Sequence, residues 1–180
     1  VHGIPSRRRV LESGDILSVD CGVHLEGLHA DSAITVPIGE VTDAVLRLLR
    51  VTREALEAGI SAAVLGNHVG DIGHAVQGVA EGAGCSVVRE LVGHGIGSSF
   101  HEEPQIPNYG KPKRGRRLVR GMTLAIEPMI NLGRPEIRTL DDKWTVVTAD
   151  GSLSAHFEHT VVIEPNGPRV LTVAPVTSPV

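Results

Sequence analysis

Two aspartates that flank a short turn segment are the first residues in the sequence able to do chemistry together. If Glu26-Gly27 forms a two-residue hairpin turn, Asp20 lies opposite Ala33 on the neighbouring strand. Asp31 then lies diagonal to Asp20 on the same face, about 7–8 Å away at the backbone, which is close enough for both carboxylates to share ions. Two acids so placed repel each other unless a cation compensates them. The alternative is that both face solvent on an edge hairpin, and the pair alone leaves the two interpretations open.

A glycine-rich segment supplies the second candidate. His94 lies within Gly93-His94-Gly95-Ile96-Gly97, and His101 follows in His101-Glu102-Glu103-Pro104. Glycines on both sides of a histidine let the backbone turn sharply and approach another group closely. A single histidine is more often structural than functional, but two of them around a glycine-rich turn favour a site.

Two glutamates occupy segments that are otherwise apolar. Glu127 lies in Leu124-Ala125-Ile126-Glu127-Pro128-Met129, and Glu158 precedes a run of β-branched residues. A glutamate in a buried strand needs a partner. A salt bridge to Arg138 could satisfy one of them, but two such glutamates beside the aspartates and His94 are better explained by metal.

Together these residues form a candidate ligand set of four carboxylates and one imidazole: Asp20, Asp31, His94, Glu127 and Glu158. Hard oxygen ligands with one imidazole suit Mn²⁺, Fe²⁺ or Co²⁺, and Zn²⁺ is also compatible. Five side chains exceed what one tetrahedral zinc uses, and the charge of four carboxylates balances two divalent ions. A water bridging two such ions is acidified to a hydroxide nucleophile near neutral pH, so the set predicts a hydrolase.

Apolar patterning predicts the elements that must position these residues. The spacing of apolar residues predicts helices over 42–59, with Thr42 as N-cap, and over 69–81. Residues 93–110 are predicted as a loop because they are rich in Gly, His and Pro. Strands are predicted at 15–24, 28–38, 86–92, 122–130, 144–148, 155–163 and 170–173. Strands, two helices and further strands indicate an α+β domain with the helices on one face of a sheet.

Length and composition restrict the class of protein. The 180 residues correspond to about one domain, and 41% hydrophobic with 21% charged residues is ordinary for a globular chain. The formal charge of −4 argues against a protein that mainly binds DNA or an anionic membrane. Two cysteines cannot form a disulfide framework, which favours the reducing cytoplasm. No apolar run approaches the roughly 18 residues of a membrane helix, and only four aromatic residues leave the core to aliphatic side chains.

The order of the motifs carries a family resemblance. The motifs are His2-Gly3-Ile4-Pro5, Asp20, Asp31, the Gly93–Gly97 segment with Phe100-His101-Glu102-Glu103-Pro104, Ile126-Glu127-Pro128-Met129, Trp144-Thr145-Val146 and Glu158-His159-Thr160. In this order and at this spacing the chain resembles a type I methionine aminopeptidase from residue 1 to about 172. The resemblance implies the pita-bread fold, a curved antiparallel sheet with helices on its outer face. It also implies removal of the N-terminal methionine from nascent polypeptides when the second residue is small.

The resemblance assigns a role to each matching position. The five ligand candidates correspond to a dinuclear metal centre, near which a monovalent cation is also allowed. Glu127 corresponds to the proton shuttle for the attacking water, and His101 to the histidine that stabilises the scissile carbonyl and the tetrahedral intermediate. His2 corresponds to a histidine that contacts the substrate and assists the transition state. Phe100 and Trp144 correspond to walls of the pocket for the methionine side chain.

The resemblance also sets the expected extent of the domain and its partners. Residues 1–173 are expected to form the catalytic metallopeptidase domain and residues 174–180 a flexible tail. The family's segment upstream of the His2 position is not in this sequence, so we expect an incomplete N-terminal half and poor stability and activity of residues 1–180 alone. The expected substrate is a peptide or nascent-chain N-terminus, and the basic segment 111–120 allows transient contact with the ribosome. Two alternatives stay open: another pita-bread peptidase that acts on X-Pro bonds, resembling prolidase, and a non-catalytic binding module.

Overall fold

A long β-hairpin runs across the molecule. The computed structural model describes residues 1–173, and in it β1 (Ile16–Leu25) and β2 (Leu28–Pro37) pair along their whole length, with Asp20 opposite Ala33 as predicted. The turn residues Glu26 and Gly27 have φ values of 50° and 83°, in the left-handed region that a two-residue hairpin turn requires. The prediction of the hairpin and its register is therefore confirmed.

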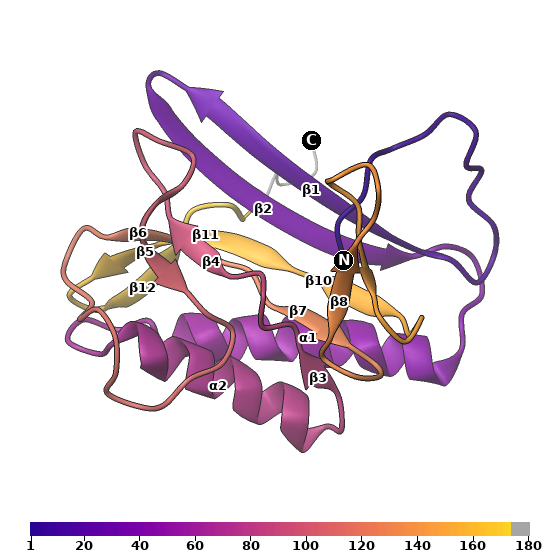
Figure 1. Cartoon of the computed structure of the whole chain (residues 1–180). Coiled ribbons are helices and arrows are strands. Elements are labelled where there is room, and N and C mark those ends of the chain that lie inside the picture. Colours follow the sequence, from indigo (N-terminus) through magenta and orange to yellow (C-terminus); the bar gives the residue numbers. More distant parts are fainter. Residues whose placement is uncertain (174–180) are drawn as a thin grey trace, which may run out of the picture.

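The hairpin forms one edge of a seven-stranded antiparallel sheet (Figure 1). Its strand order is β1-β2-β11-β6-β4-β5, and β12 pairs with β11 outside this path. The other members are β4 (Gly93–Gly95), β5 (Glu102–Ile106), β6 (Thr123–Ile126), β11 (Glu158–Glu164) and β12 (Gly167–Val170). A three-stranded sheet contains β10 (Ser154–His156), β7 (Met129–Asn131) and β3 (Ser86–Val87), and a two-stranded sheet contains β8 (Ile137–Thr139) and β9 (Val146–Thr148). The α+β class and the curved antiparallel sheet are confirmed.

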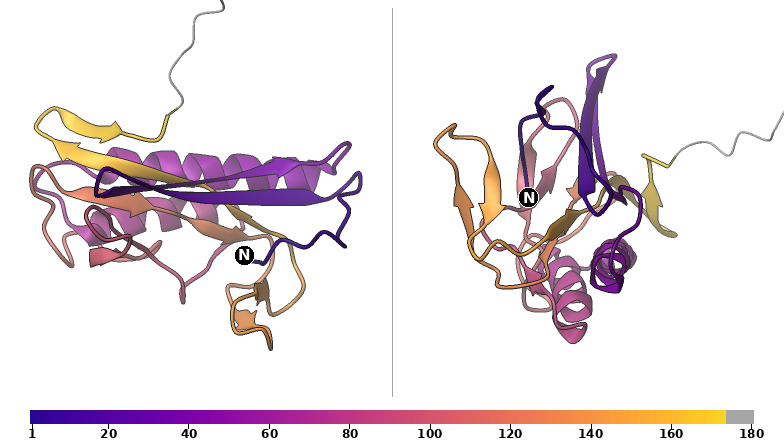
Figure 2. Two further views of the ribbon diagram at one scale, coloured as in Figure 1. Left: turned by 90° about the horizontal axis from the view of Figure 1, so that it is seen from above. Right: turned by 90° about the vertical axis from the view of Figure 1, so that its right-hand side faces the viewer.

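Both helices cover the same face of the sheets (Figure 2). α1 (Asp43–Ala62) begins at Thr42, whose hydroxyl accepts a hydrogen bond from the Val45 amide, and α2 is Val69–Gly82. α1 does not end at Gly59 as predicted. A Cβ at Gly59 would lie 2.8 Å from a Val76 methyl, so this glycine allows close packing of the two helices. None of the helices within residues 1–173 is long and apolar enough to cross a membrane.

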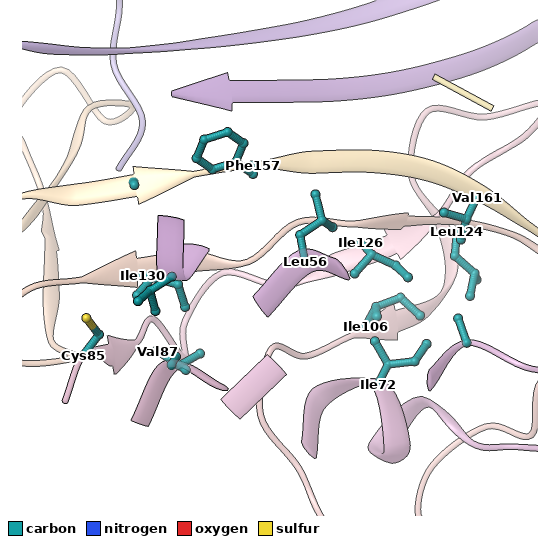
Figure 3. Close-up of a cluster of buried hydrophobic side chains, with 14 of the residues drawn as sticks. Leu56, Ile72, Cys85, Val87, Ile106, Leu124, Ile126, Ile130, Phe157 and Val161 are labelled. Atoms are coloured by element: carbon teal, nitrogen blue, oxygen red, sulfur yellow. The ribbon is translucent and has the colours of Figure 1, made fainter. Parts of the chain in front are cut away.

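Aliphatic side chains fill the space between the helices and the sheets (Figure 3). Leu56 from α1 and Ile72 from α2 pack against Leu124, Ile126 and their neighbours from the strands, and Phe157 is the aromatic member of this cluster. Burial of these side chains holds the helix-covered face of the sheet against the two helices. The opposite face is thereby left to polar residues.

The segment predicted as a glycine-rich loop, 93–110, instead contains β4 and β5. β4 pairs with β5 on one side and with β6 on the other, so its position is set by two neighbouring strands. A Cβ at Gly93 would clash with the Ala125 carbonyl oxygen, and one at Gly95 with the Glu103 carbonyl oxygen. The glycines that made the segment resemble a loop are required for this close pairing.

Several predicted strands have different limits in the structure. The 122–130 strand is interrupted at Glu127-Pro128, where proline cannot donate to a ladder, and its second half joins another sheet as β7. The 155–163 strand is likewise divided, at Phe157, into β10 and β11. The 86–92 and 144–148 strands are shorter in the structure, as β3 and β9, and β8 was not predicted. The prediction of a strand at 170–173 is wrong, because β12 ends at Val170. The predicted tail, 174–180, lies outside the described residues.

Candidate metal centre

Three strands carry the first row of candidate ligands. Ala33 on β2 pairs with Asp20 on β1 and with Glu158 on β11. Directly paired residues of antiparallel strands point to the same face, so Asp20 and Glu158 flank Ala33 on one face. Asp31 lies two residues before Ala33 and therefore also points to this face.

A second row completes the set. Ala125 on β6 pairs with His94 on β4 and with Thr160 on β11. Glu127 follows β6 two residues beyond Ala125, and Thr160 lies two residues beyond Glu158, so the two rows share one face. The centres of the two rows are the small buried residues Ala33 and Ala125, exposed by 2% and 0%. The register alone thus gathers all five predicted ligands on the face opposite the helices, above a floor of two alanines.

The ligand atoms fall into two groups whose members lie within 4.8 Å of one another. The first, fully buried group is Asp31, His94 and Glu158. The second is His2, Asp20 and His156, in which Asp20 is exposed. Asp20 is therefore grouped with two histidines rather than with the buried ligands.

Glu127 lies between the two groups. Its Oε1 atom is 3.6 Å from His94 Nε2, and its Oε2 atom is 3.5 Å from His156 Nε2. His94 Nε2 is also 4.0 Å from Asp31 Oδ2. Each Glu127 oxygen thus faces a different imidazole, and the carboxylate connects the buried group to the second one.

The charges of the site are not compensated by the protein. Burial, and then the charges of Glu127, Asp31 and Asp20, raise the pKa of Glu158 to about 10. Burial and the nearby Asp20 raise the pKa of Asp31 to about 6. Within residues 1–173, no lysine or arginine forms an ion pair with these carboxylates, so the predicted alternative of a salt bridge from Arg138 is absent there.

The donor set fits divalent metal ions. Glu158 Oε1 is buried without a hydrogen-bond partner, although Glu158 is only 2% exposed. Oxygen-rich sites with one imidazole are typical of Mn²⁺, Fe²⁺, Co²⁺ or Zn²⁺. Divalent ions would remove the repulsion that raises the pKa values of Asp31 and Glu158.

Hydroxyl and amide groups that the sequence analysis did not single out hold the site. Thr160 Oγ1 accepts from the Asp31 amide at 2.9 Å and contacts the Asp31 carbonyl oxygen at 2.8 Å. Asn108 Nδ2 donates to the Glu127 carbonyl oxygen at 3.1 Å. A threonine in a strand is ordinary, so only the pairing of β2 with β11 exposes its role.

The predicted catalytic histidines each lie beside a different one of the two ligand groups. The His101 ring is 4.4 Å from the His94 ring, and His2 lies 5.5 Å from His156, held by backbone hydrogen bonds to Val146. Burial lowers the pKa of His2, with the neighbouring His156 lowering it further. Partial shielding from water, together with the neighbouring His94, also lowers the pKa of the exposed His101 ring. Both rings are therefore neutral hydrogen-bond donors at neutral pH.

The two predicted pocket residues have different environments. The Phe100 ring packs 4.8 Å from the His101 ring and lies over Gly22, where any Cβ would overlap it. Gly22 pairs with Asp31 in the hairpin, so Phe100 is adjacent to the ligands. Trp144, by contrast, exposes 63% of its surface and lies before β9.

Comparison with known proteins identifies the family. Residues 1–165 match the family model described as metallopeptidase family M24. The chain is 52% identical over 172 residues to a methionine aminopeptidase of Clostridium acetobutylicum, covering 96% of this chain and 69% of that protein. The chain belongs to the methionine aminopeptidases of family M24. The fold also matches the crystal structure of methionine aminopeptidase from Thermotoga maritima. The TM-score is 0.94 and the identity 47%, over 96% of this chain and 70% of that one.

A peptidase of the alternative type is less similar. An X-Pro aminopeptidase from Thermotoga maritima matches with a TM-score of 0.73 and 25% identity, covering 97% of this chain but 43% of that one. The shared fold thus extends to X-Pro peptidases, while the higher identity lies with the methionine aminopeptidases. Membership of a metallopeptidase family implies metal ions, and the buried cluster is the candidate place for them.

Proposed function

We propose that Asp20, Asp31, His94, Glu127 and Glu158 hold two divalent ions and that this site removes N-terminal methionine from peptides. The observation that carries the proposal is the convergence of all five side chains on one face, where their charges have no lysine or arginine partner within residues 1–173. Family membership supplies the reaction, which is hydrolysis of the first peptide bond.

The ions are proposed to be two of Mn²⁺, Fe²⁺, Co²⁺ or Zn²⁺, since four carboxylates balance two divalent charges. When bound, such ions polarise a carbonyl group and lower the pKa of a coordinated water. A monovalent cation nearby is a further part of the proposal, and it rests on the family resemblance alone.

Glu127 is proposed as the group that moves the proton. Its two oxygens lie 3.6 Å from His94 Nε2, in the buried group, and 3.5 Å from His156 Nε2, in the second group. Its carboxylate accepts the proton of the attacking water and returns it to the leaving amine. A position between the two groups of ligand atoms suits a residue that moves a proton.

His101 and His2 are proposed to stabilise the oxygen on which negative charge develops. Their lowered pKa values keep both rings neutral, and a neutral imidazole N–H donates to a carbonyl oxygen without adding charge to the metal site. His101 is exposed and so accessible to the substrate.

The methionine side chain is proposed to lie against Phe100, with Trp144 as a second wall. An unbranched thioether favours an apolar surface and makes favourable contacts with aromatic rings. The contact of Phe100 with His101 and Gly22 places such a surface next to the ligands. The requirement for a small second residue rests on the resemblance.

The physiological substrate is proposed to be a peptide or nascent-chain N-terminus in the cytoplasm. The segment 111–120 carries six of the 17 basic residues and is mostly exposed. These positive charges suit a transient contact with ribosomal RNA during synthesis. Membrane and specific DNA partners are not part of the proposal.

The test is peptide cleavage by the Mn²⁺-loaded enzyme. Met-Ala-Ser, Met-Leu-Ser and an X-Pro tripeptide are compared, with Asp31→Ala as the matched control. We expect free methionine from Met-Ala-Ser, little from Met-Leu-Ser, no cleavage of the X-Pro peptide and no activity in the control. Preferred cleavage of the X-Pro peptide would replace the proposed substrate. Absence of both ion binding and cleavage would leave a non-catalytic module.

A further inference from the structure

His156 has no role in the proposed reaction, yet it lies against two of its central groups. Its ring is 1% exposed, and neither Nδ1 nor Nε2 has a hydrogen-bond partner among the described residues. Buried polar groups are almost always paired, so a buried imidazole without a partner calls for a functional explanation. Glu127 Oε2, a carboxylate oxygen, lies 3.5 Å from Nε2.

We propose that His156 is a positioning residue that holds the Glu127 carboxylate through a hydrogen bond from its Nε2–H group. The inference deepens the proposed function and rests on it, because Glu127 matters only if the site is catalytic. A carboxylate free to rotate about its last torsion presents either oxygen to its neighbours. A donor fixed at Oε2 leaves Oε1 facing His94, 3.6 Å away, on the side of the buried ligands.

The backbone of His156 is fixed well enough for this role. The Thr35 hydroxyl lies 2.9 Å from the His156 amide nitrogen and 2.8 Å from the His156 carbonyl oxygen. His156 also pairs with Met129 in the ladder between β10 and β7. Since the His156 backbone is held on the sheet and its ring is buried, a small rotation of the Glu127 side chain would shorten the 3.5 Å separation to hydrogen-bond length.

The His156 ring also restricts the movement of both Glu127 and His2. The His2 and His156 rings meet edge to face at 5.5 Å, so the His156 ring contacts both the Glu127 carboxylate and the His2 imidazole. Removal of the ring would leave both groups with more freedom. Outer-shell partners of this kind typically contribute about 10–100-fold to activity or metal affinity.

A competing role for His156 is ligation. Its ring nitrogen, His2 and Asp20 lie close enough to hold an ion of their own. The positioning role is favoured because Nε2 lies 3.5 Å from a carboxylate oxygen that already belongs to the site. The two roles predict different behaviour of glutamine, whose amide can donate from the position of Nε2 but is a poor ligand for these metal ions.

The experiment compares wild type, His156→Gln and His156→Leu in the full-length Mn²⁺-loaded enzyme. Readouts are kcat and KM for Met-Ala-Ser, bound ions per chain by elemental analysis, and the melting temperature. We expect Leu to lower kcat about 10–100-fold with KM within about twofold. Two ions remain bound, and the Leu variant melts at or above the wild type because the buried Nδ1 atom, which has no hydrogen-bond partner, has left the core. Glutamine is expected to restore kcat to within about threefold of the wild type.

Each other outcome overturns the inference in a recognisable way. Wild-type kcat in the Leu variant removes the positioning role. Loss of one ion from both variants assigns His156 as a ligand instead. A lower melting temperature together with proportional loss of bound ion and activity in both variants makes it a structural residue. Failure of the proposed function is distinct, because the wild type itself would then bind no ions or release no methionine.

Discussion

Glu158 makes the stability of the metal-free enzyme depend on pH. Its carboxyl group keeps a proton in the folded state up to about pH 10, compared with 4.5 for an ordinary glutamate. Between these pH values the folded state binds one more proton than the unfolded state, so the free energy of unfolding falls as pH rises. The slope is about 1.4 kcal/mol per pH unit for one proton.

Glu158→Gln isolates this contribution. Glutamine has nearly the same shape and no titration, so every other group contributes to both proteins alike. In the presence of a chelator, we expect the unfolding free energy of the wild type relative to the variant to fall by about 2.7 kcal/mol between pH 7 and pH 9. The assay is urea unfolding of both proteins at pH 7, 8 and 9.

Metal ions are expected to stabilise the wild type more than the Glu158→Gln variant. Ions that bind only the folded state stabilise it by about 2.7 kcal/mol at 100 times the dissociation constant. The wild type gains this stabilisation, whereas the variant lacks one ligand and gains less. The assignment of a protonated, uncompensated Glu158 would be refuted if, under chelation, the unfolding free energy of the wild type relative to that of the variant stayed constant or rose with pH.

Three further predictions concern single features of the site. His101→Ala should lower kcat about 10²–10³-fold while both ions stay bound; a variant that loses its ions but keeps its rate per loaded molecule would contradict the role of His101. Gly22→Val should displace the Phe100 ring and raise KM for Met-Ala-Ser about tenfold without changing ion binding, and an unchanged KM would exclude this part of the pocket. Ion binding at pH 7.5 should release about one proton per chain, since Glu158 is protonated in the metal-free protein, and calorimetry in two buffers of different ionisation enthalpy measures it. Below pH 6 the release should increase as Asp31 becomes protonated, and zero release at both pH values would contradict the pKa values.

Local sequence signals predicted the hairpin and both helices. Glu26-Gly27 sets the turn, and a two-residue turn leaves one register, so the Asp20–Ala33 pair follows from the sequence alone. The helices follow from apolar periodicity and from the Thr42 cap. Glutamates inside apolar strands were likewise visible, because a buried carboxylate needs an unusual environment.

Features that depend on contacts distant in sequence could not be predicted in this way. β4 is a strand because β5 and β6 lie on its two sides, although its own glycines favour a loop. Gly59 is a contact point between helices and not a helix end, for the same reason. The grouping of Asp20 with His2 and His156, apart from Asp31, His94 and Glu158, likewise depends on contacts between segments distant in sequence.

The dependence of methionine release on bound ions tests the central claim most directly. Metal-free enzyme is titrated with Mn²⁺ while free methionine from Met-Ala-Ser is measured, with Asp31→Ala titrated in parallel. The account predicts no release in chelator, a rate that rises with bound ion to a plateau at two ions per chain, and no recovery in the Asp31→Ala enzyme. Full release in chelator, or near wild-type recovery of Asp31→Ala at the same Mn²⁺ concentration, would contradict it.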